Sequence, residues 1–375
     1  MTTPLVTFRG HRGGVNALLC EEEKHANVLA SGGDDGSCRL WDVRTTRATR
    51  SMNIKKALGI TAQDDPSESA VNSLAFSADG NYIHVAASNK VLTFDLRQEE
   101  LVFNCASKEI LQDNDDEINS LTRHPGKAGK YLSAPDDNGD IRVYDMESHR
   151  LYKTLRGQHV NICSAAPFRP NAPWDLVSGG LDGFLLFWDF SRGRMKFKID
   201  LNTGINSLDS SSTSSSSTAS SADADTASVN RMFNPPLVHS LAFAPNGKSF
   251  AAGLGDASIA LVEFNSKQIV RRLKQHSAAV SQVHFPAFKG SEWLVSCGND
   301  AKICIWDYQK ALSSSGSRAQ SESSSSSDVD TVDSDPDLVK EFAVAKGPNA
   351  ITTCLHQNLV LVSDVTSVIS AYPVL

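Results

Sequence analysis

Short runs in which hydrophobic and polar residues alternate recur along this chain, and turns rich in Gly, Asp and Ser separate them. Alternation with a period of two is typical of β-strands that bury one face. In residues 28–42, two such runs flank a turn of Gly and Asp residues, which predicts a β-hairpin. The pattern therefore predicts an all-β chain assembled from hairpins.

The hairpins carry an internal repeat of four residue types. His, Ser, Asp and Trp occur in this order three times, with four residues from Ser to Asp and six from Asp to Trp. The distance from His to Ser is 20, 19 and 20 residues, and Asp follows each Trp. Repeats of about 40–45 residues ending in Trp-Asp are the signature of β-propeller blades. The copies are His11/Ser31/Asp35/Trp41, His159/Ser178/Asp182/Trp188 and His276/Ser296/Asp300/Trp306.

Four weaker units have another hydrophobic residue in place of the Trp; they end at Phe94-Asp95, Tyr144-Asp145, Val262-Glu263 and Tyr372-Pro373. The repeat resembles that of the WD-repeat β-propellers, and the units predict seven blades, with six or eight as alternatives. The last unit has no room for an outer strand, whereas residues 5–8 form a strand without a blade of its own. We expect this N-terminal strand to complete the last blade and close the ring, which removes exposed sheet edges.

Residues 1–375 are thus expected to form a single propeller, interrupted by two Ser-rich segments. Residues 207–228 lie between blades 4 and 5, and residues 312–337 lie within blade 6. Both are predicted to be disordered, because they contain too few apolar residues to offset the entropy lost on ordering. Propeller geometry places the first on the face that carries His11 and the second on the face that carries Asp42.

The same segments contain candidate phosphorylation sites. Ser220, Ser325 and Ser327 each have an acidic residue three positions later, which suits acid-directed kinases. Phosphorylation adds about −1.5 to −2 charge per site and creates a ligand for an Arg cluster. The alternative is a passive insertion, which is tolerated because long surface loops add little closure entropy.

Composition narrows the class of protein. The formal net charge is −7 and the pI is near 5.8, so we expect no general electrostatic attraction to nucleic acid. The seven Cys form no CxxC motif or paired spacing, which argues against a zinc site or a disulfide framework. The sequence shows no basic, apolar leader and no apolar run of membrane-spanning length. We expect a soluble intracellular protein, cytoplasmic or nuclear.

His, Ser and Asp also form hydrolase triads, so the repeated residues raise the alternative of an enzyme. A catalytic nucleophile acts at one exposed site, whereas this trio occurs three times and always ends in a Trp. The resemblance implies that the twelve residues form buried structural networks, in which polar groups satisfy one another. The sequence contains no HExxH metal motif and no GxxxxGK[ST] loop. We therefore predict no catalytic residue, no metal and no cofactor.

Two strand ends carry a more specific surface motif. Trp41-Asp42-Val43-Arg44 resembles the end of the sixteen-residue box found in WD-repeat receptors of cullin-4 ubiquitin ligases. The resemblance implies that Asp42 and Arg44 contact the adaptor, damaged-DNA-binding protein 1, and Arg44 would offer it a planar bidentate donor. Asp95 and Arg97 form a partial copy of the motif in the next blade. The alternative is that each Arg is an ordinary solvated turn residue.

Further strings resemble one family, that of WD repeat-containing protein 53. The resemblance is strongest over blades 4, 6 and 7, and the Ser-rich segments depart from it. It implies a non-enzymatic substrate receptor of a cullin-4 ligase; the alternative is a scaffold subunit of another assembly without a ligase. The strings are residues 161–164, 168–170 with Pro173, 176–182, 234–235, 280–283, 298–300 and 369–373.

Overall fold

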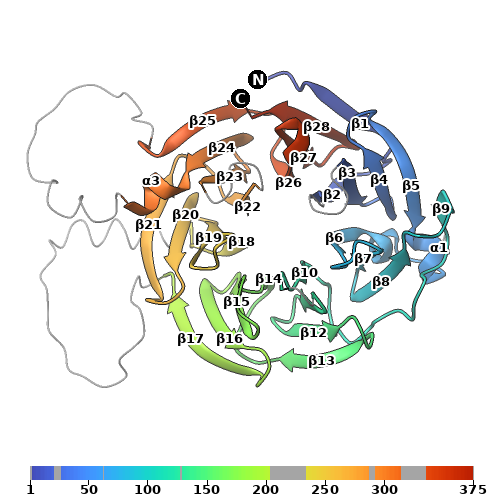
Figure 1. Ribbon diagram of the computed structural model, residues 1–375, viewed down its shortest axis with the longest axis horizontal. Coiled ribbons are helices and arrows are strands. Elements are labelled where there is room, and N and C mark those ends of the chain that lie inside the picture. Colours follow the sequence, from blue (N-terminus) through green and yellow to red (C-terminus); the bar gives the residue numbers. More distant parts are fainter. Residues whose placement is uncertain are drawn as a thin grey trace, which may run out of the picture.

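The computed structural model describes residues 2–20, 27–61, 63–126, 129–202, 234–286, 292–313 and 335–374. Within these ranges the strands form seven sheets, which stand side by side in a ring around a central channel (Figure 1). Consecutive strands of each blade pair in an antiparallel manner, from the channel outwards. The predicted seven-bladed propeller is therefore confirmed.

The four strands of a typical blade follow one another along the chain. Blade 1 comprises β2 (Val15–Cys20), β3 (Val28–Gly33), β4 (Ser37–Asp42) and β5 (Arg47–Asn53). Blade 2 comprises β6 (Val71–Phe76), β7 (Tyr82–Ala87) and β8 (Lys90–Asp95). Blade 3 comprises β10 (Thr122–Arg123), β11 (Tyr131–Pro135), β12 (Ile141–Asp145) and β13 (Arg150–Leu155). Blade 4 comprises β14 (Cys163–Ala165), β15 (Asp175–Gly180), β16 (Phe184–Asp189) and β17 (Arg194–Asp200). Blade 5 comprises β18 (Val238–Phe243), β19 (Ser249–Leu254), β20 (Ser258–Glu263) and β21 (Gln268–Lys274).

Blade 6 comprises β22 (Val280–His284), β23 (Trp293–Gly298), β24 (Lys302–Asp307) and β25 (Leu338–Ala343). Blade 7 comprises β26 (Pro348–Cys354), β27 (Leu359–Asp364), β28 (Val368–Pro373) and β1 (Val6–Arg9). The described helices are short connections: α1 (Ile54–Leu58), η1 (Pro66–Ser69), α3 (Tyr308–Ser313) and η4 (Leu355–Gln357).

The N-terminal strand closes the ring. β1 pairs with β28 in an antiparallel register that runs from Val6 opposite Ala371 to Arg9 opposite Val368. Figure 1 shows the two ends of the chain side by side at this blade. The predicted closure by the N-terminal strand is therefore confirmed, and the outermost strand of blade 7 comes from the start of the chain.

Blades 2 and 3 are less regular than the others. The sheet of blade 2 has three strands, and the next strand, β9 (Val102–Phe103), instead pairs in parallel with β5 of blade 1. In blade 3 the inner strand is reduced to a bridge between Ile118 and Asp136, followed by the two-residue β10. The Ile118 N–H donates to the Ser88 carbonyl of blade 2.

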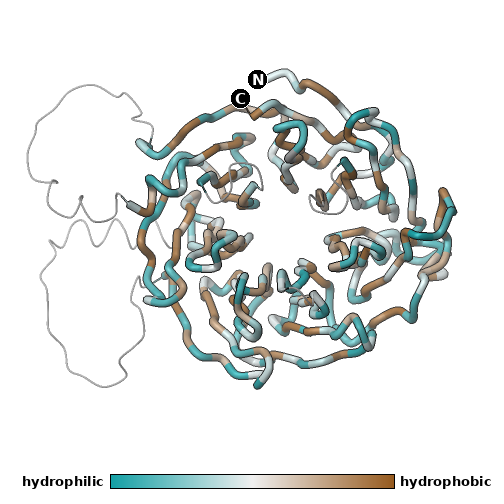
Figure 2. Tube along the Cα trace, viewed as in Figure 1, coloured by the Kyte–Doolittle hydropathy of each residue, from teal (hydrophilic) through white to brown (hydrophobic). Residues whose placement is uncertain are grey.

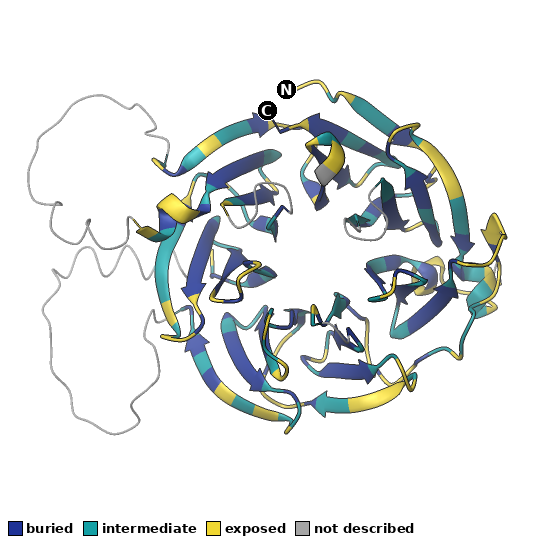
Figure 3. Ribbon diagram, viewed as in Figure 1, coloured by how far each residue is buried: buried dark blue, intermediate teal, exposed yellow. Residues whose placement is uncertain are grey.

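The hydrophobic core is divided into seven layers, one between each pair of neighbouring blades. Trp41, for example, packs with residues of blade 7, and Trp188 packs with residues of blade 3. The two middle strands of most blades are buried, whereas the outer strands are mostly exposed or intermediate (Figure 3). Figure 2 shows hydrophobic and hydrophilic residues following one another along the outer ring. Each blade therefore depends on both neighbours for burial of its apolar surface.

Small residues before the central turn allow the blades to approach one another. A Cβ atom on Gly32 would lie 2.2 Å from Cγ1 of Val71 in blade 2. A Cβ atom on Gly179 would lie 2.4 Å from Cγ1 of Val238 in blade 5. These distances are too short for any side chain, so glycine is required where the next inner strand crosses.

A repeated β-bulge lines the central channel. In six inner strands the register shifts at one polar residue, as between Val15 and Ala17 or between Val280 and Gln282. The bulged side chain often binds the next blade: Ser164 donates to the Val238 carbonyl at 2.6 Å, and Asn349 donates to the Val15 carbonyl at 3.3 Å. These hydrogen bonds join neighbouring blades around the channel, where bulges redirect the polar side chains.

The two predicted Ser-rich insertions lie largely outside the described residues. Their described flanks are ordered: Leu201 donates its N–H to the Gly183 carbonyl, and Asp335 pairs with Arg271 at 3.0 Å. Residues 312–313 belong to α3, and residues 335–337 precede β25. The candidate phosphorylation sites Ser220, Ser325 and Ser327 also lie outside the described residues.

Candidate protein-docking face

The alternation of strands gives the propeller two faces. One face carries His11, His159 and His276, which lie in loops before the inner strands of blades 1, 4 and 6; we call it the His face. The opposite face carries the turns between the third and outer strands, including Asp42 with Arg44 and Asp95 with Arg97; we call it the Arg face. The two groups of predicted residues therefore lie on opposite sides of the ring.

On the His face, each predicted His/Ser/Asp/Trp set is joined by hydrogen bonds. In blade 1, His11 contacts Asp35 through Nδ1 at 3.1 Å and Ser31 through Nε2 at 2.7 Å, and Trp41 Nε1 donates to Ser31 at 2.8 Å. The indole N–H donates to the Ser hydroxyl, which also contacts the imidazole, so one hydroxyl joins the Trp to the His.

The other two sets repeat this geometry. The Trp188 Nε1 to Ser178 Oγ distance is 2.8 Å, and the corresponding distance from Trp306 to Ser296 is 2.9 Å. His159 and His276 contact their Ser partners at 2.8 Å through Nε2, and they contact Asp182 and Asp300 through Nδ1. Three nearly identical arrangements with buried Ser and Trp offer no unique exposed nucleophile, so the geometry is that of a structural network.

The Asp of each set connects two segments of backbone. Asp35 accepts N–H groups from Arg12 and Ser37 in addition to its contact with His11. Burial raises the pKa of Asp35, but hydrogen bonds from His11, Ser37 and Arg12 outweigh it and hold the pKa well below its usual value. The pKa values of Asp182 and Asp300 are lowered in the same way, against the effect of burial.

On the Arg face, blades 1 and 2 present two matching ion pairs. Arg44 donates two hydrogen bonds to Asp42, from Nε to Oδ1 at 3.0 Å and from Nη2 to Oδ2 at 2.8 Å. Arg97 grips Asp95 in the same way at 2.9 and 2.6 Å, and its Nη2 also donates to the Tyr82 hydroxyl. The Arg side chains are 64% and 57% exposed, whereas the Asp side chains are 20% and 16% exposed. Each Asp therefore holds its Arg in a fixed position with the outer edge of the guanidinium facing solvent.

Equivalent turns in other blades lack this arrangement. Asp145 in blade 3 accepts the backbone N–H of Glu147, and Asp307 in blade 6 accepts that of Lys310. In blade 4, Arg192 lies one position later than the Arg of the other pairs, at 3.8 Å from Asp189, with its side chain 80% exposed. Among the described turns, the bidentate Asp–Arg pair with this spacing occurs in blades 1 and 2, which are adjacent in the ring (Figure 1).

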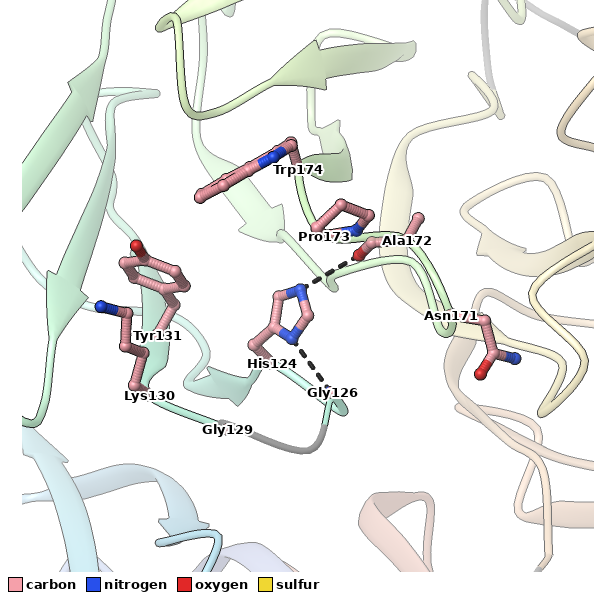
Figure 4. Close-up of a pocket in the computed structure, with 9 residues that line it drawn as sticks. All are labelled: His124, Gly126, Gly129, Lys130, Tyr131, Asn171, Ala172, Pro173 and Trp174. Atoms are coloured by element: carbon pink, nitrogen blue, oxygen red, sulfur yellow. Dashed lines mark hydrogen bonds between the residues drawn. The ribbon is translucent and has the colours of Figure 1, made fainter.

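The Arg face also contains a mostly apolar pocket that the sequence did not predict. It lies between the first and second strands of blades 3 and 4 and has a volume of about 450 Å³ (Figure 4). Trp174, 40% exposed, stands across from Tyr131, and the ring centroids are 6.0 Å apart. His124 lies at the base; its Nε2 contacts the Ala172 carbonyl at 3.1 Å, and burial lowers the pKa of its imidazole. The pocket lining is His124, Gly126, Gly129, Lys130, Tyr131, Asn171, Ala172, Pro173 and Trp174.

Blade 3 contains a second arrangement that the sequence did not reveal. Arg142 is fully buried and pairs with the equally buried Asp136 at 3.1 Å and with Asp140 at 3.0 Å. Tyr144 donates its hydroxyl to Asn114 at 2.9 Å, and Asn114 in turn donates to Asp136 at 3.0 Å. This network replaces the His/Ser/Asp/Trp set that blade 3 lacks.

The described residues also bear on metal binding and on membrane crossing. In the described ranges, no group of three or more His, Cys, Asp or Glu is placed to hold a metal ion. No helix in these ranges is both long and apolar enough to cross a membrane.

The repeat, the ring and the buried networks define a WD-repeat β-propeller of the protein-interaction scaffold type. Residues 2–172 match the family model of the nucleolar protein 10-like N-terminal domain, and residues 227–287 match that of the anaphase-promoting complex subunit 4 WD40 domain.

Three known proteins illustrate the similarity. The WD repeat-containing protein 53 homolog of Dictyostelium discoideum is 30% identical over 312 residues, which cover 81% of this chain and 78% of that protein. WD repeat-containing protein ATCSA-1 of Arabidopsis thaliana is 24% identical, over 80% of this chain and 67% of that protein. Apoptotic protease-activating factor 1 of Mus musculus is 24% identical, over 75% of this chain but only 22% of that protein. The chain belongs to the WD repeat-containing protein 53 family.

Proposed function

We propose that this propeller is a non-enzymatic substrate receptor of a cullin-4 ubiquitin ligase, docking to damaged-DNA-binding protein 1 through its Arg face. The observation that carries the proposal is that two adjacent blades each present a bidentate Asp–Arg ion pair, Asp42 with Arg44 and Asp95 with Arg97; we call these pairs the forks. Asp42 and Asp95 each hold an Arg by two hydrogen bonds and leave the rest of its guanidinium exposed. A fixed guanidinium loses little entropy when it binds a carboxylate or carbonyl of a partner.

The pocket beside the forks supports the same face. Protein interfaces combine a few buried aromatic or Arg anchors with a surrounding rim that excludes water. Trp174 and Tyr131 provide an apolar pocket on the face where Arg44 and Arg97 provide charge. We propose that an apolar side chain of the same adaptor enters this pocket, while the opposite face, with the channel mouth, receives the client protein.

The test is a pull-down of the tagged full chain, probed for damaged-DNA-binding protein 1. The Arg44→Ala/Arg97→Ala variant is expected to recover at least ten-fold less adaptor than wild type, because both fixed donors are removed. Arg44→Lys/Arg97→Lys is expected to show a partial loss, since an ammonium keeps the charge but not the bidentate geometry. Arg192→Ala is the matched control: it is exposed on the same face and lies near Asp189 at 3.8 Å.

The variants are compared at equal folded concentration, measured by circular dichroism. Recovery that is equal for wild type and the double Arg variant would exclude docking through these residues. If wild type recovers no adaptor at all, the Arg pairs are solvated turns, and the scaffold function without a ligase takes precedence. Trp174→Ala tests the pocket separately from the forks. If Trp174→Ala recovers less adaptor than wild type while Arg192→Ala recovers the same amount, the pocket belongs to the interface.

A further inference from the structure

Two cysteines meet where the ring closes. Cys20 is the last residue of β2, the inner strand of blade 1, and Cys354 is the last residue of β26, the inner strand of blade 7. The Cys20 N–H donates to Thr352 Oγ1 at 3.3 Å, which fixes the two strand ends against each other. Both side chains belong to the apolar layer between blades 7 and 1, where the Cys20 thiol lies against Cys354. Residues far apart in sequence are thereby brought into sulfur–sulfur contact.

The two thiols differ in exposure and in surroundings. Cys354 is 1% exposed and belongs to the hydrophobic layer between blades 7 and 1, whereas Cys20 is half-buried. The Cys354 sulfur accepts the Cys20 thiol and the backbone N–H groups of Gln357 and His356. These hydrogen bonds outweigh burial and lower the pKa of Cys354 to about 7.

The other buried cysteines are in the opposite situation. Burial raises the pKa of Cys297 to about 12, and it also raises the pKa of Cys38, Cys163 and Cys304. A buried thiol of raised pKa is inert, whereas a thiolate with hydrogen-bond donors and an accessible neighbouring thiol is the arrangement of redox-sensitive cysteines. Cys354 with Cys20 is therefore chemically distinct from the buried cysteines elsewhere in the described structure.

We propose that Cys20 and Cys354 form a modification site for hydrogen peroxide and related hydroperoxides, which oxidise the pair to a disulfide across the closing seam. Cys20, the accessible partner, attacks a peroxide oxygen while its proton passes to the Cys354 thiolate. The O–O bond breaks, and Cys20 becomes a sulfenic acid. Hydroxide leaves and becomes water by taking up from solvent the proton that Cys354 had released on ionising. The Cys354 sulfur then attacks the Cys20 sulfur, the S–O bond breaks, and a second water leaves with the thiol proton.

The step balances without any other reagent. Two thiols lose two electrons in total and one peroxide gains them, with two water molecules as products. The sulfurs need to approach from hydrogen-bond contact to a bond of about 2.05 Å, which is a movement on the order of 1–2 Å. The resulting bond links the inner strand of blade 1 directly to the inner strand of blade 7, whereas β1 closes the ring at the outer edge of blade 7.

The experiment treats the full chain with hydrogen peroxide, blocks the remaining thiols by alkylation and maps the peptides by mass spectrometry. The expected result is a peptide pair linked through Cys20 and Cys354, two fewer alkylated thiols, and reversal by dithiothreitol. Closing so long a loop is expected to raise the thermal midpoint of the oxidised chain by roughly 5 °C. Cys105→Ser, which removes an exposed cysteine, is the matched control and is expected to behave as wild type.

Several outcomes would overturn the proposal. Oxidation that yields a different pair, a dimer linked through Cys105, or Cys20 sulfinic acid without a link would each exclude a Cys20–Cys354 disulfide. Cys20→Ser is expected to abolish the link and to leave Cys354 alkylated after peroxide treatment. Because the linked peptide is measured in wild type, the result does not depend on whether Cys354→Ser folds.

Discussion

In blade 1, the path from the channel loop to the third strand runs through His11, Ser31 and Trp41, whereas in blade 3 it runs from Asn114 directly to Tyr144. Trp41 and Tyr144 occupy the same register, opposite Leu29 and Leu132 respectively. The phenol hydroxyl reaches Asn114 at 2.9 Å, so the intermediate Ser is not needed. Ala134 stands where blade 1 has Ser31.

The two blades also differ in charge. Two residues before the aromatic side chain, blade 1 has the half-buried Arg39 and blade 3 has the fully buried Arg142. Arg142 is compensated by Asp136, Asp140 and Asp115, whereas the charged group in the path through blade 1 is Asp35, whose carboxylate is held by hydrogen bonds. A blade can thus satisfy its buried polar groups by a chain that ends at one carboxylate or by a cluster around a buried Arg, and the cluster is more costly to break.

The largest effect is expected from Asp136→Asn. It leaves the buried Arg142 charge without its fully buried partner, so the free energy of unfolding is expected to fall by about 3–5 kcal/mol. Urea denaturation followed by circular dichroism measures this change. Arg156→Ala is the matched control, because Arg156 also pairs with Asp115 and Asp140 but is 61% exposed; its expected cost is below about 1 kcal/mol. Equal costs for the two variants would remove the distinction between the blades.

A smaller effect is expected from Ser178→Ala in blade 4. The change leaves Trp188 Nε1 and His159 Nε2 without a partner in a buried site, which costs about 1–3 kcal/mol. The same denaturation experiment on Ala134→Ser, which introduces a hydroxyl at the corresponding position of blade 3, is expected to show no gain in stability. A gain there would mean that blade 3 is an incomplete copy and not an alternative solution.

The smallest effect is a dependence of stability on acid. The pKa values of Asp35, Asp182 and Asp300 are lower in the folded state than in the unfolded chain. Their contribution is therefore complete above the unfolded pKa, near 4, and is lost as the pH falls towards the folded values. The thermal midpoint of wild type is expected to fall as the pH is lowered below about 4. In Asp182→Asn it is expected to fall less steeply. Parallel curves would show that this carboxylate does not contribute.

The seven-bladed ring could be predicted because the repeat itself specifies it. The Trp-Asp positions fix the third strand in three blades, and a Phe, Tyr or Val at the same position fixes it in the other four. The strand left over at residues 5–8 predicts the closure that β1 and β28 display. The shortened inner strand of blade 3 could not be predicted, because residues 118–121 show the same hydrophobic and polar pattern as the inner strand of blade 2. Its Ile118 N–H bonds to Ser88 of the neighbouring blade, and such a contact between blades leaves no local pattern.

The candidate site was only partly predictable. Asp42, Arg44, Asp95 and Arg97 were identified as residues, but the way each Asp holds its Arg depends on turn geometry that spacing does not report. The apolar pocket was missed because Tyr131 and Trp174 come from different blades and only the fold brings them together. Trp174, an aromatic residue at the start of a strand and outside the repeat pattern, was the one signal in the sequence.

Closure by β1 has a consequence for how the protein is made. The strand that completes blade 7 is synthesised first, and its partner β28 is synthesised last. At about 5–20 residues per second, β1 waits on the order of 20 to 75 seconds before it can pair. During that interval its N–H and C=O groups form a free edge, and six blades must assemble without a seventh to hold them in a ring. Propellers of this design therefore leave the edge of the first strand unpaired until the last blade has been made, which makes early contact with a chaperone most valuable at this strand.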